Sequence, residues 1–247
     1  MLIYGRNAVL EAIREGQATR VLLAQGINKG TIREFEKLAN KHDLTIRHVP
    51  RIELDQELKT TNHQGIVAEL AEMKFSEPDA PFKLAEERGE RLLVILLDQL
   101  NDPRNYGAII RSAEALGAHG VITEERRSAP LSPVAVKASA GATSYIPLIQ
   151  VKNLPRYIDD LKRRNVWIYG AAGEAYNQTK DIDWDRDAAL VIGSEGTGLR
   201  RLVRDKCDDT LAIHLKGHVT SLNASVAAGI LIHDIVNARE QGQSRNV

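Results

Sequence analysis

The sequence predicts an α/β protein with a mainly parallel sheet in its larger domain and a second, smaller α/β domain before it. Short apolar runs alternate with amphipathic segments along most of the 247 residues, which is typical of strands separated by helices. The run from Leu92 to Leu97 is apolar throughout, as expected for a strand buried on both faces of a parallel sheet. Residues 73–90, rich in proline and glutamate, interrupt the alternation and indicate a linker.

Composition limits the class of protein. Hydrophobic residues make up 43% and charged residues 27%, a balance that permits a buried core. No apolar run approaches the roughly 18 residues of a membrane span, and the N-terminus lacks the pattern of a signal peptide, so we expect a cytoplasmic protein. The single cysteine, Cys207, excludes an internal disulfide. The 33 basic and 33 acidic residues cancel, which disfavours a uniformly basic nucleic-acid-binding domain but leaves room for a local patch.

The first domain, residues 1–72, should contain three helices and three strands. Helices are predicted over Asn7–Glu15, Lys29–His42 and Pro50–Leu58, and strands over Arg20–Ala24, Leu44–His48 and Gly65–Leu70. Pro50 suits the first turn of its helix because its missing N–H has no partner there in any case. A domain of this size is near the lower limit for independent stability.

The second domain, residues 91–247, continues the alternation of strands and helices. Strands are predicted over Leu92–Asp98, Gly120–Thr123, Ser144–Leu148, Val166–Ala171, Ala188–Gly193 and Asp209–Ile213. Helices are predicted over Pro103–Leu116, Pro133–Ser139, Leu154–Arg164, Leu199–Lys206 and Ser221–Arg239. We expect residues 241–247 to be disordered. Strands joined by helices in this way form a parallel sheet that is covered on both faces.

Three segments that follow strands are candidates for a ligand site. They are Asp98–Arg111, Gly193–Gly198 and Ile213–Asn223. Ligands bind at the carboxyl ends of strands in open parallel sheets, so these segments should meet at one edge.

The glycine-rich segment Gly193-Ser-Glu-Gly-Thr-Gly198 follows a buried strand. Glycines there let the backbone approach a ligand and leave amides free to bind it. Its spacing matches neither the dinucleotide fingerprint nor the phosphate-binding P-loop. A tight turn without a ligand is the alternative.

The pattern Asn105-x-Gly107-x-x-x-Arg111 lies in a predicted helix. Gly107 and Arg111 are four residues apart and so share a face. A glycine inside a helix costs about 1 kcal/mol, which indicates that another segment packs closely there. Arg111 should point over the glycine toward the same space; alternatively, it is an exposed arginine that pairs with Glu114 or Asp102.

The segment before the last helix holds further candidates. The hydroxyl of Thr220 or Ser221 can cap the helix, and the amide of Asn223, in its first turn, can point into the cleft. Capping alone is the alternative. His214 and His218 flank a glycine in a loop, without a glutamate between them, so we predict no metal site.

The three segments together, in this order, resemble the motifs of the SpoU-like RNA 2′-O-ribose methyltransferases, the TrmH family of the SPOUT class. The similar stretches are Leu97–Arg111, Val191–Leu199 and Val219–Ala227, and Tyr4–Ala12 and His63–Ala68 resemble the ends of the family's N-terminal RNA-substrate domain. The resemblance covers nearly the whole chain and is closest to the branch that methylates a guanosine ribose in 23S, the large-subunit ribosomal RNA. That branch often has Ile-Pro-Met where this chain has Ile213-His-Leu; because backbone forms most of the pocket there, we expect binding to be retained.

The resemblance implies a reaction and a set of site residues. Transfer of a methyl group from S-adenosyl-L-methionine to a ribose hydroxyl of RNA would use Asn105, Arg111, Glu195, Ser221 and Asn223, with Gly193, Gly196, Ile213 and Leu222 holding the cofactor. Arginine is almost never deprotonated, so Arg111 should orient groups or stabilise the developing alkoxide. The resemblance also implies a homodimer that completes the active site and a C-terminal trefoil knot, an exception among folds.

Other functions remain open at this point. The chain could methylate the ribose of transfer RNA, or it could be a non-catalytic RNA-binding module of the same fold; a nucleotide hydrolase is disfavoured by the missing P-loop. Four basic clusters are candidates for RNA contact, although each could equally be a solvated face. They are Arg47/His48/Arg51, Arg126/Arg127, Lys162/Arg163/Arg164 and Arg200/Arg201/Arg204.

Overall fold

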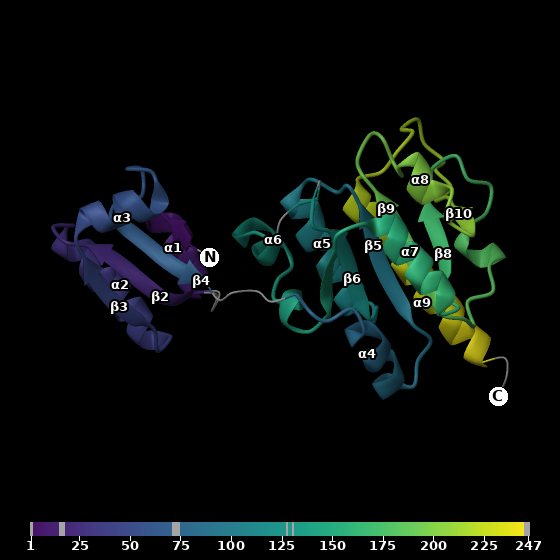
Figure 1. Ribbon diagram of the computed structural model, residues 1–247, viewed down its shortest axis with the longest axis horizontal. Helices are drawn as coiled ribbons and strands as arrows, with labels where there is room; N and C mark the ends of the chain where they lie inside the picture. Colours follow the sequence, from purple (N-terminus) through teal and green to yellow (C-terminus); the bar gives the residue numbers. More distant parts are fainter. Residues whose placement is uncertain (1, 15–17, 71–74, 127, 130, 245–247) are drawn as a thin grey trace. The chain divides into compact units, whose positions relative to one another are not determined.

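The computed structural model describes residues 2–14, 18–70, 75–126, 128–129 and 131–244, and the chain forms two compact units, Met1–Lys74 and Phe75–Val247 (Figure 1). The first unit contains β1 (Leu2–Tyr4), α1 (Arg6–Arg14), β2 (Ala18–Ala24), α2 (Lys29–Lys41), β3 (Thr45–Val49), α3 (Arg51–Leu58) and β4 (Ile66–Leu70). Its sheet has the order β1-β4-β2-β3, in which β2 and β3 are parallel and the other pairs antiparallel. Strand β1 escaped prediction because it is only three residues long.

Alternating side chains of the first sheet face two different cores. Val21 and Leu23 pack with α1 and α2, whereas Leu22 packs with α3, as the two-residue period of a strand requires. The turn before β4 is held by the buried His63: its Nδ1 accepts from the Gly65 amide (3.0 Å) and its Nε2 donates to Asp55 (2.7 Å). The helices of this unit therefore cover both faces of the central strands β2 and β4.

The second unit is built on a six-stranded, all-parallel sheet. Its elements are α4 (Ala80–Arg88), β5 (Leu93–Asp98), α5 (Pro103–Ala115), β6 (Gly120–Glu124), α6 (Pro133–Ala138), the 3-10 turn η1 (Ala142–Ser144), β7 (Leu148–Val151), α7 (Leu154–Arg163), β8 (Trp167–Ala171), the 3-10 turn η2 (Thr179–Asp181), β9 (Ala188–Gly193), α8 (Arg201–Arg204), β10 (Asp209–Leu211) and α9 (Ala224–Ser244). The strand order is β10-β8-β9-β5-β6-β7, so the predicted mainly parallel α/β fold is confirmed.

The chain reverses its direction across the sheet between β5 and β9. From β5 it proceeds outward to β6 and β7, and it then crosses back to β8 and β9. Helices α4, α7 and α8 contribute to the core on one face, while α5 packs with α9 and with α6, and α9 also contacts β9 (Figure 1). A cleft opens at such a reversal, at the carboxyl ends of the two adjacent strands. Asp98 and Gly193, which end β5 and β9, are paired across it.

The linker predicted over 73–90 is wrong for its second half. Residues 80–88 form α4, which ends at Gly89 in the left-handed region (φ 64°), and Phe82 and Ala85 pack into the core of the second unit. Pro81 lies in the first turn, where proline favours a helix rather than breaking it. Residues 71–74 lie outside the described residues.

Some predicted ends are also corrected. The strand expected at Ser144–Leu148 begins only at Leu148, because η1 precedes it, and the helix expected at Leu199–Lys206 is reduced to α8. The last helix begins at Ala224 and continues to Ser244, through the first part of the tail expected to be disordered; residues 245–247, like Glu15, lie outside the described part. Within the described ranges, no helix is long and apolar enough to cross a membrane.

Candidate functional site

The first motif is fixed by the start of α5. Asp102 caps this helix, accepting a hydrogen bond from the Arg104 amide (2.8 Å), and Pro103 occupies the first turn. Asn105 therefore lies in the first turn, directly after the loop from β5. Its side chain is buried, with only 6% of the residue exposed, so its amide must find partners within the protein.

The glycine-rich segment forms a closed loop after β9. Ser194 and Gly198 exchange backbone hydrogen bonds (3.1 and 3.0 Å), and the hydroxyls of Ser194 and Thr197 are 2.6 Å apart. A Cβ at Gly193 would overlap the backbone of Gly198, so no other residue fits at the neck of the loop. Glu195 lies within this loop, between Ser194 and Gly198.

The third motif starts α9. The Asn223 side-chain oxygen accepts from the Ser225 amide (2.9 Å), the Ser225 hydroxyl (2.6 Å) and the Val226 amide (3.3 Å). Asn223, rather than Thr220 or Ser221, is therefore the cap, and the predicted capping role of those two residues is wrong. The same amide group still has its Nδ2 free to donate elsewhere.

One hydrogen-bonded cluster joins the three motifs. Asn223 Nδ2 donates to Glu195 Oε1 (2.6 Å) and to Asn105 Oδ1 (3.0 Å), and Asn105 Nδ2 donates to the same Glu195 oxygen (2.6 Å). We call Asn105, Glu195 and Asn223 the amide–carboxylate cluster. Glu195 Oε2 has no partner among the residues that the structure describes, so this oxygen is available to an incoming group.

A cavity of about 620 Å³ lies beside the cluster. Gly193, Gly196, Ile213 and Leu222, the four residues expected to hold a cofactor, all line it, as do Glu195, Ser221 and Asn223. The remaining wall comes from Ala171–Glu174 after β8 and from apolar side chains of β10 and α9. Its volume and its mixture of apolar walls and glycine backbone suit a nucleoside-sized ligand. Glu174 forms an ion pair with Arg204 at this cavity, and the pKa of Glu174 is lowered by a backbone hydrogen bond and by that guanidinium.

Arg111 and Ser221 do not belong to the cluster. Arg111 is exposed on α5, and within the described ranges its side chain forms no hydrogen bond or ion pair, so the expected alternative partners Glu114 and Asp102 do not bind it. Gly107 is covered by α6, since a Cβ there would overlap the Ala135 carbonyl; the predicted close packing is confirmed. Ser221 is exposed at the edge of the cavity.

Sequence analysis missed a buried ion network at the ends of β5 and β6. The backbone amide and Nε of Arg200 both donate to Asp98 (2.7 and 2.5 Å), and its Nη2 donates to Glu124 (2.9 Å). Asp98 is fully buried and Glu124 nearly so. The available signal is Asp98, an acidic residue at the end of an apolar strand, but the sequence places Arg200 in a cluster expected to be exposed.

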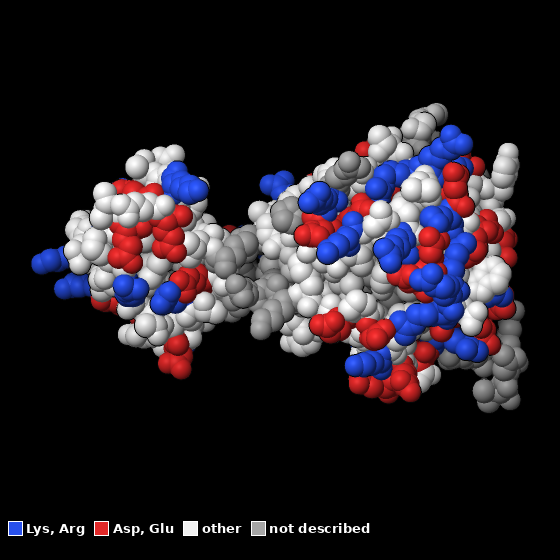
Figure 2. Space-filling model, viewed as in Figure 1, with Lys and Arg blue, Asp and Glu red and all other residues white. Residues whose placement is uncertain are grey.

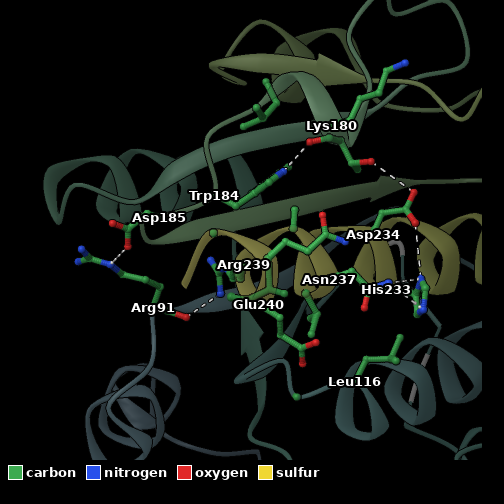
Figure 3. A pocket seen from close by; sticks show the side chains of 18 of the residues that line it. Arg91, Leu116, Lys180, Trp184, Asp185, His233, Asp234, Asn237, Arg239 and Glu240 are labelled. Atoms are coloured by element: carbon green, nitrogen blue, oxygen red, sulfur yellow. Dashed lines mark hydrogen bonds and ion pairs between the residues drawn. The ribbon is translucent and has the colours of Figure 1, made fainter. Parts of the chain in front are cut away.

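A second, larger hollow of about 1390 Å³ lies at the amino ends of the strands (Figure 3). Its polar groups bind one another: Arg91 pairs with Asp185, Thr179 donates to Asp234, and the Trp184 indole donates to the Thr179 carbonyl. Arg239 donates to three backbone carbonyls, and burial lowers its pKa to about 10. None of the motif residues lines this hollow, so we place the functional site at the carboxyl edge.

Metal and thiol chemistry find no support in the geometry. Among the described residues, no group of three or more His, Cys, Asp or Glu side chains is gathered as a metal would need. The Cys207 thiol is half-buried beside Gly170 of β8, and desolvation raises its pKa to about 12, which does not suit the reactive thiolate of a nucleophile.

Comparison with known proteins identifies the family. Residues 92–233 match the SpoU rRNA methylase family, and residues 2–76 match the RNA 2′-O ribose methyltransferase substrate-binding family. The chain belongs to the SpoU methylase family. A Bacillus subtilis protein named as a TrmH family tRNA/rRNA methyltransferase, YacO, is 41% identical over 238 residues, covering 96% of this chain and 95% of the relative. A Staphylococcus aureus protein named as the same kind of enzyme is 40% identical, covering 96% of each chain.

Solved structures agree with this assignment. The SpoU methyltransferase AviRb from Streptomyces viridochromogenes, in complex with AdoMet, superposes with a TM-score of 0.67 at 27% identity, covering 98% of this chain and 91% of the other. A TrmH family protein from Porphyromonas gingivalis gives a TM-score of 0.61 at 25% identity, covering 95% and 88%. This SpoU methylase therefore uses S-adenosylmethionine as cofactor. The glycine-rich loop Gly193–Gly198 and the cavity beside the cluster fit that molecule.

Proposed function

We propose that this SpoU methylase transfers the methyl group of S-adenosylmethionine to a ribose 2′-hydroxyl of RNA, with a guanosine of 23S ribosomal RNA as the acceptor. The amide–carboxylate cluster carries the proposal, because three side chains from three separate motifs meet beside a cavity of suitable size. A protein that only bound RNA would not need a carboxylate held by two amides at the mouth of such a cavity.

The cofactor supplies a methyl group already activated by its sulfonium charge. The protein therefore has to hold it and align the hydroxyl with the carbon–sulfur bond. In our proposal the glycine backbone at Gly193 and Gly196 and the segment from Ile213 to Leu222 bind the cofactor, with Ser221 helping to shape the mouth of the cavity. Arg111, always charged, binds the ribose or its phosphate and stabilises negative charge on the attacking oxygen.

The hydroxyl proton needs an acceptor. As the oxygen forms its bond to the methyl carbon, the carbon–sulfur bond breaks, the sulfur keeps its electrons, and the proton leaves the hydroxyl. Glu195 is the carboxylate within the cluster, and its Oε2 has no partner among the described residues. We propose that this oxygen takes the proton while the two asparagine amides hold the other oxygen in place.

Direct transfer tests the function. Purified protein is given S-adenosylmethionine with a radiolabelled methyl group and an unmodified in vitro transcript of 23S ribosomal RNA, with total transfer RNA as a parallel acceptor. Label at one alkali-resistant ribose of the 23S transcript supports the proposal. Label in transfer RNA alone would reassign the acceptor, and cofactor binding without transfer to any RNA would overturn the reaction.

Replacement of Arg111 tests its role. Arg111→Ala removes the charge near the attacking oxygen but leaves the cavity intact, so we expect kcat to fall by about 100-fold or more with cofactor affinity changed less than about twofold. Single-turnover transfer and calorimetry measure the two quantities. Lys180→Ala, an exposed cation on η2, is the control. Transfer by Arg111→Ala at the wild-type rate would exclude the role.

The resemblance supplies further proposals. We propose that the first unit binds the RNA substrate, that the protein works in the cytoplasm, that the segment entering α9 forms a trefoil knot, and that the protein is a homodimer. The exposed Val226 and Ile230, one turn apart on α9 beside α5, support the dimer, since they form an apolar face on the helix pair that bears Arg111.

A further inference from the structure

The amide–carboxylate cluster divides the carboxyl edge of the large sheet into two halves. The cofactor cavity occupies one half, over β8, β9 and β10. The other half, over β5, β6 and β7, bears four exposed basic side chains, each following the carboxyl end of a strand: Arg104, Arg126, Lys152 and Arg156. We call these four residues the basic edge. Within the described part of the chain, none of their side chains has a hydrogen-bond or ion-pair partner.

Backbone contacts hold the basic edge together. The Glu125 amide donates to the Val151 carbonyl (2.8 Å), which brings Arg126 beside Lys152. The Ala129 amide donates to the Leu100 carbonyl (2.6 Å), which ties the loop after β6 to the loop leading to Arg104. The loops that carry the basic edge are therefore tied to one another, and Arg104 directly precedes Asn105 in the chain.

Exposed carboxylates on the same segments offset half of the charge of the basic edge. They are Glu125 and Asp102, and Asp102 is already engaged as the cap of α5. The four cations and these two carboxylates sum to +2, while the buried Asp98 and Glu124 share Arg200, and Glu195 adds one negative charge at the cluster. The amino ends of α5 and α7 point to the same edge, and their dipoles add positive potential.

The basic residues from Lys162 to Arg164 and from Arg201 to Lys206 are neutralised. Over this part of α7 and α8, blue and red side chains interleave (Figure 2). Each of these cations has a carboxylate partner: Lys162 with Asp208, Arg163 with Asp160, Arg164 with Asp79, Arg201 with Asp205, Arg204 with Glu174 and Lys206 with Asp159. Two of the four basic clusters expected to be RNA contacts are therefore largely paired; Arg127, of a third, lies outside the described residues.

We infer that the acceptor RNA lies along the basic edge, with its phosphates on Arg126 and Lys152 and its reactive ribose at the cluster. This inference rests on the proposed function and adds the direction from which RNA approaches. The methyl donor lies over β8, β9 and β10, and the acceptor RNA lies over β5, β6 and β7. Phosphate contacts of this kind position a nucleic acid without reading its sequence. Unpaired cations suit them because no internal ion pair has to be broken first.

A charge-matched pair of variants tests the inference. Arg126→Gln/Lys152→Gln removes two charges from the basic edge, and Arg163→Gln/Arg201→Gln removes two from the paired surface, where the side chains are 74% and 94% exposed. Binding of the full-length proteins to an unmodified 23S transcript is measured from 0.1 to 1 M salt. Methyl transfer to the same RNA and cofactor binding are measured separately, and thermal unfolding checks that all variants fold.

We expect the edge variant to lose two phosphate contacts. The slope of log affinity against log salt should fall by about 1.4 to 1.8, which weakens binding at 0.1 M salt by roughly 25- to 60-fold. KM for RNA should rise with it, while kcat and cofactor affinity stay within about twofold. The control variant should stay within about twofold of wild type in binding.

The outcomes separate the surface from the reaction. If both variants lose RNA affinity equally, or neither loses any, the inferred role of the basic edge in RNA binding is overturned. The proposed reaction still stands in that case if the wild-type protein transfers methyl groups to RNA. Selective loss of binding in a protein that transfers no methyl to any RNA would support the surface and overturn the reaction. Failure of the wild-type protein to bind RNA would overturn both.

Discussion

Asn223 serves the helix and the site with opposite ends of one amide group. Its oxygen caps α9, and its nitrogen donates to Glu195 and Asn105. From the sequence alone, the hydroxyls of Thr220 and Ser221 are equally good candidates for the cap, because local spacing does not show which of these nearby polar residues turns inward. The position of the helix start was decided by partners 28 and 118 residues away.

Gly193 makes a testable prediction at the scale of one residue. Gly193→Ala places a methyl group into the backbone of Gly198, so we expect the loop to open, the free energy of unfolding to fall by about 1–3 kcal/mol and cofactor binding to be lost. Calorimetry with S-adenosylmethionine and urea unfolding measure these effects. Gly173→Ala is the matched control, since it lines the same cavity with open space around its Cβ. If Gly193→Ala binds S-adenosylmethionine with unchanged affinity, the glycine-rich loop does not hold the cofactor.

Cys207 predicts a dependence on pH. Burial raises its pKa from 9.0 to about 12, so the folded protein keeps the thiol protonated between those values while the unfolded chain forms thiolate. At pH 8, alkylation of the thiol should therefore be about a thousandfold slower in the native protein than in the urea-unfolded chain. The alkylation rate of the unfolded chain should rise further as the pH approaches 9. Mass spectrometry after timed alkylation measures both rates. Comparable native and unfolded rates would show that the thiol is accessible.

At the scale of elements, Arg200 connects segments that the chain separates widely. It lies after the glycine-rich loop, while Asp98 ends β5 and Glu124 ends β6. Glu124 also accepts from the Leu154 amide at the start of α7 (2.9 Å). The ends of β5 and β6 and the start of α7 are thus fixed around one guanidinium.

Loss of this guanidinium should be costly. Arg200→Gln leaves two buried carboxylates without their cation, and we expect the free energy of unfolding to fall by about 3 kcal/mol. Its neighbour Arg201→Gln breaks only an exposed pair with Asp205 and should change stability by less than about 1 kcal/mol. Urea unfolding compares the two. Equal stabilities would show that the buried network does not hold these elements.

The sequence predicted elements best where burial sets a clear period. The apolar strands and amphipathic helices of the large sheet lie close to their predicted positions, because each must bury one face or both. Prediction fails for α4, because prolines suggest a break where Pro81 in fact helps to start the helix, and for β1, which is too short to show a period. The network of Arg200 was also invisible, because its partners are 102 and 76 residues distant.

At the scale of the whole molecule, the proposed dimer can be broken by charge. Val226 and Ile230 are 49% and 36% exposed on α9, and Val226→Asp/Ile230→Asp would place like charges on both sides of a symmetric interface. We expect monomers by light scattering and loss of methyl transfer. Leu202→Asp, an exposed apolar residue on α8, is the control. A dimer that persists in the double variant would move the interface elsewhere.

The position of the site followed from the strand order more than from any single motif. The carboxyl ends of parallel strands lie at one edge of a sheet, so three motifs that follow three strands are expected at the same edge. Their hydrogen bonds were not predictable, and neither was the exposure of Arg111, because both depend on how α5, α9 and the glycine-rich loop pack in space.

The double use of Asn223 also constrains how this protein could drift over generations. A homologue that lost the methylation activity would be free to change Glu195, but α9 would still require a side-chain acceptor at its N-cap, position 223. Inactive homologues should therefore retain aspartate, serine or asparagine at 223 while their glycine-rich loops diverge. Residue 223 would then be retained for helix capping alone, after its role in the cluster has been lost.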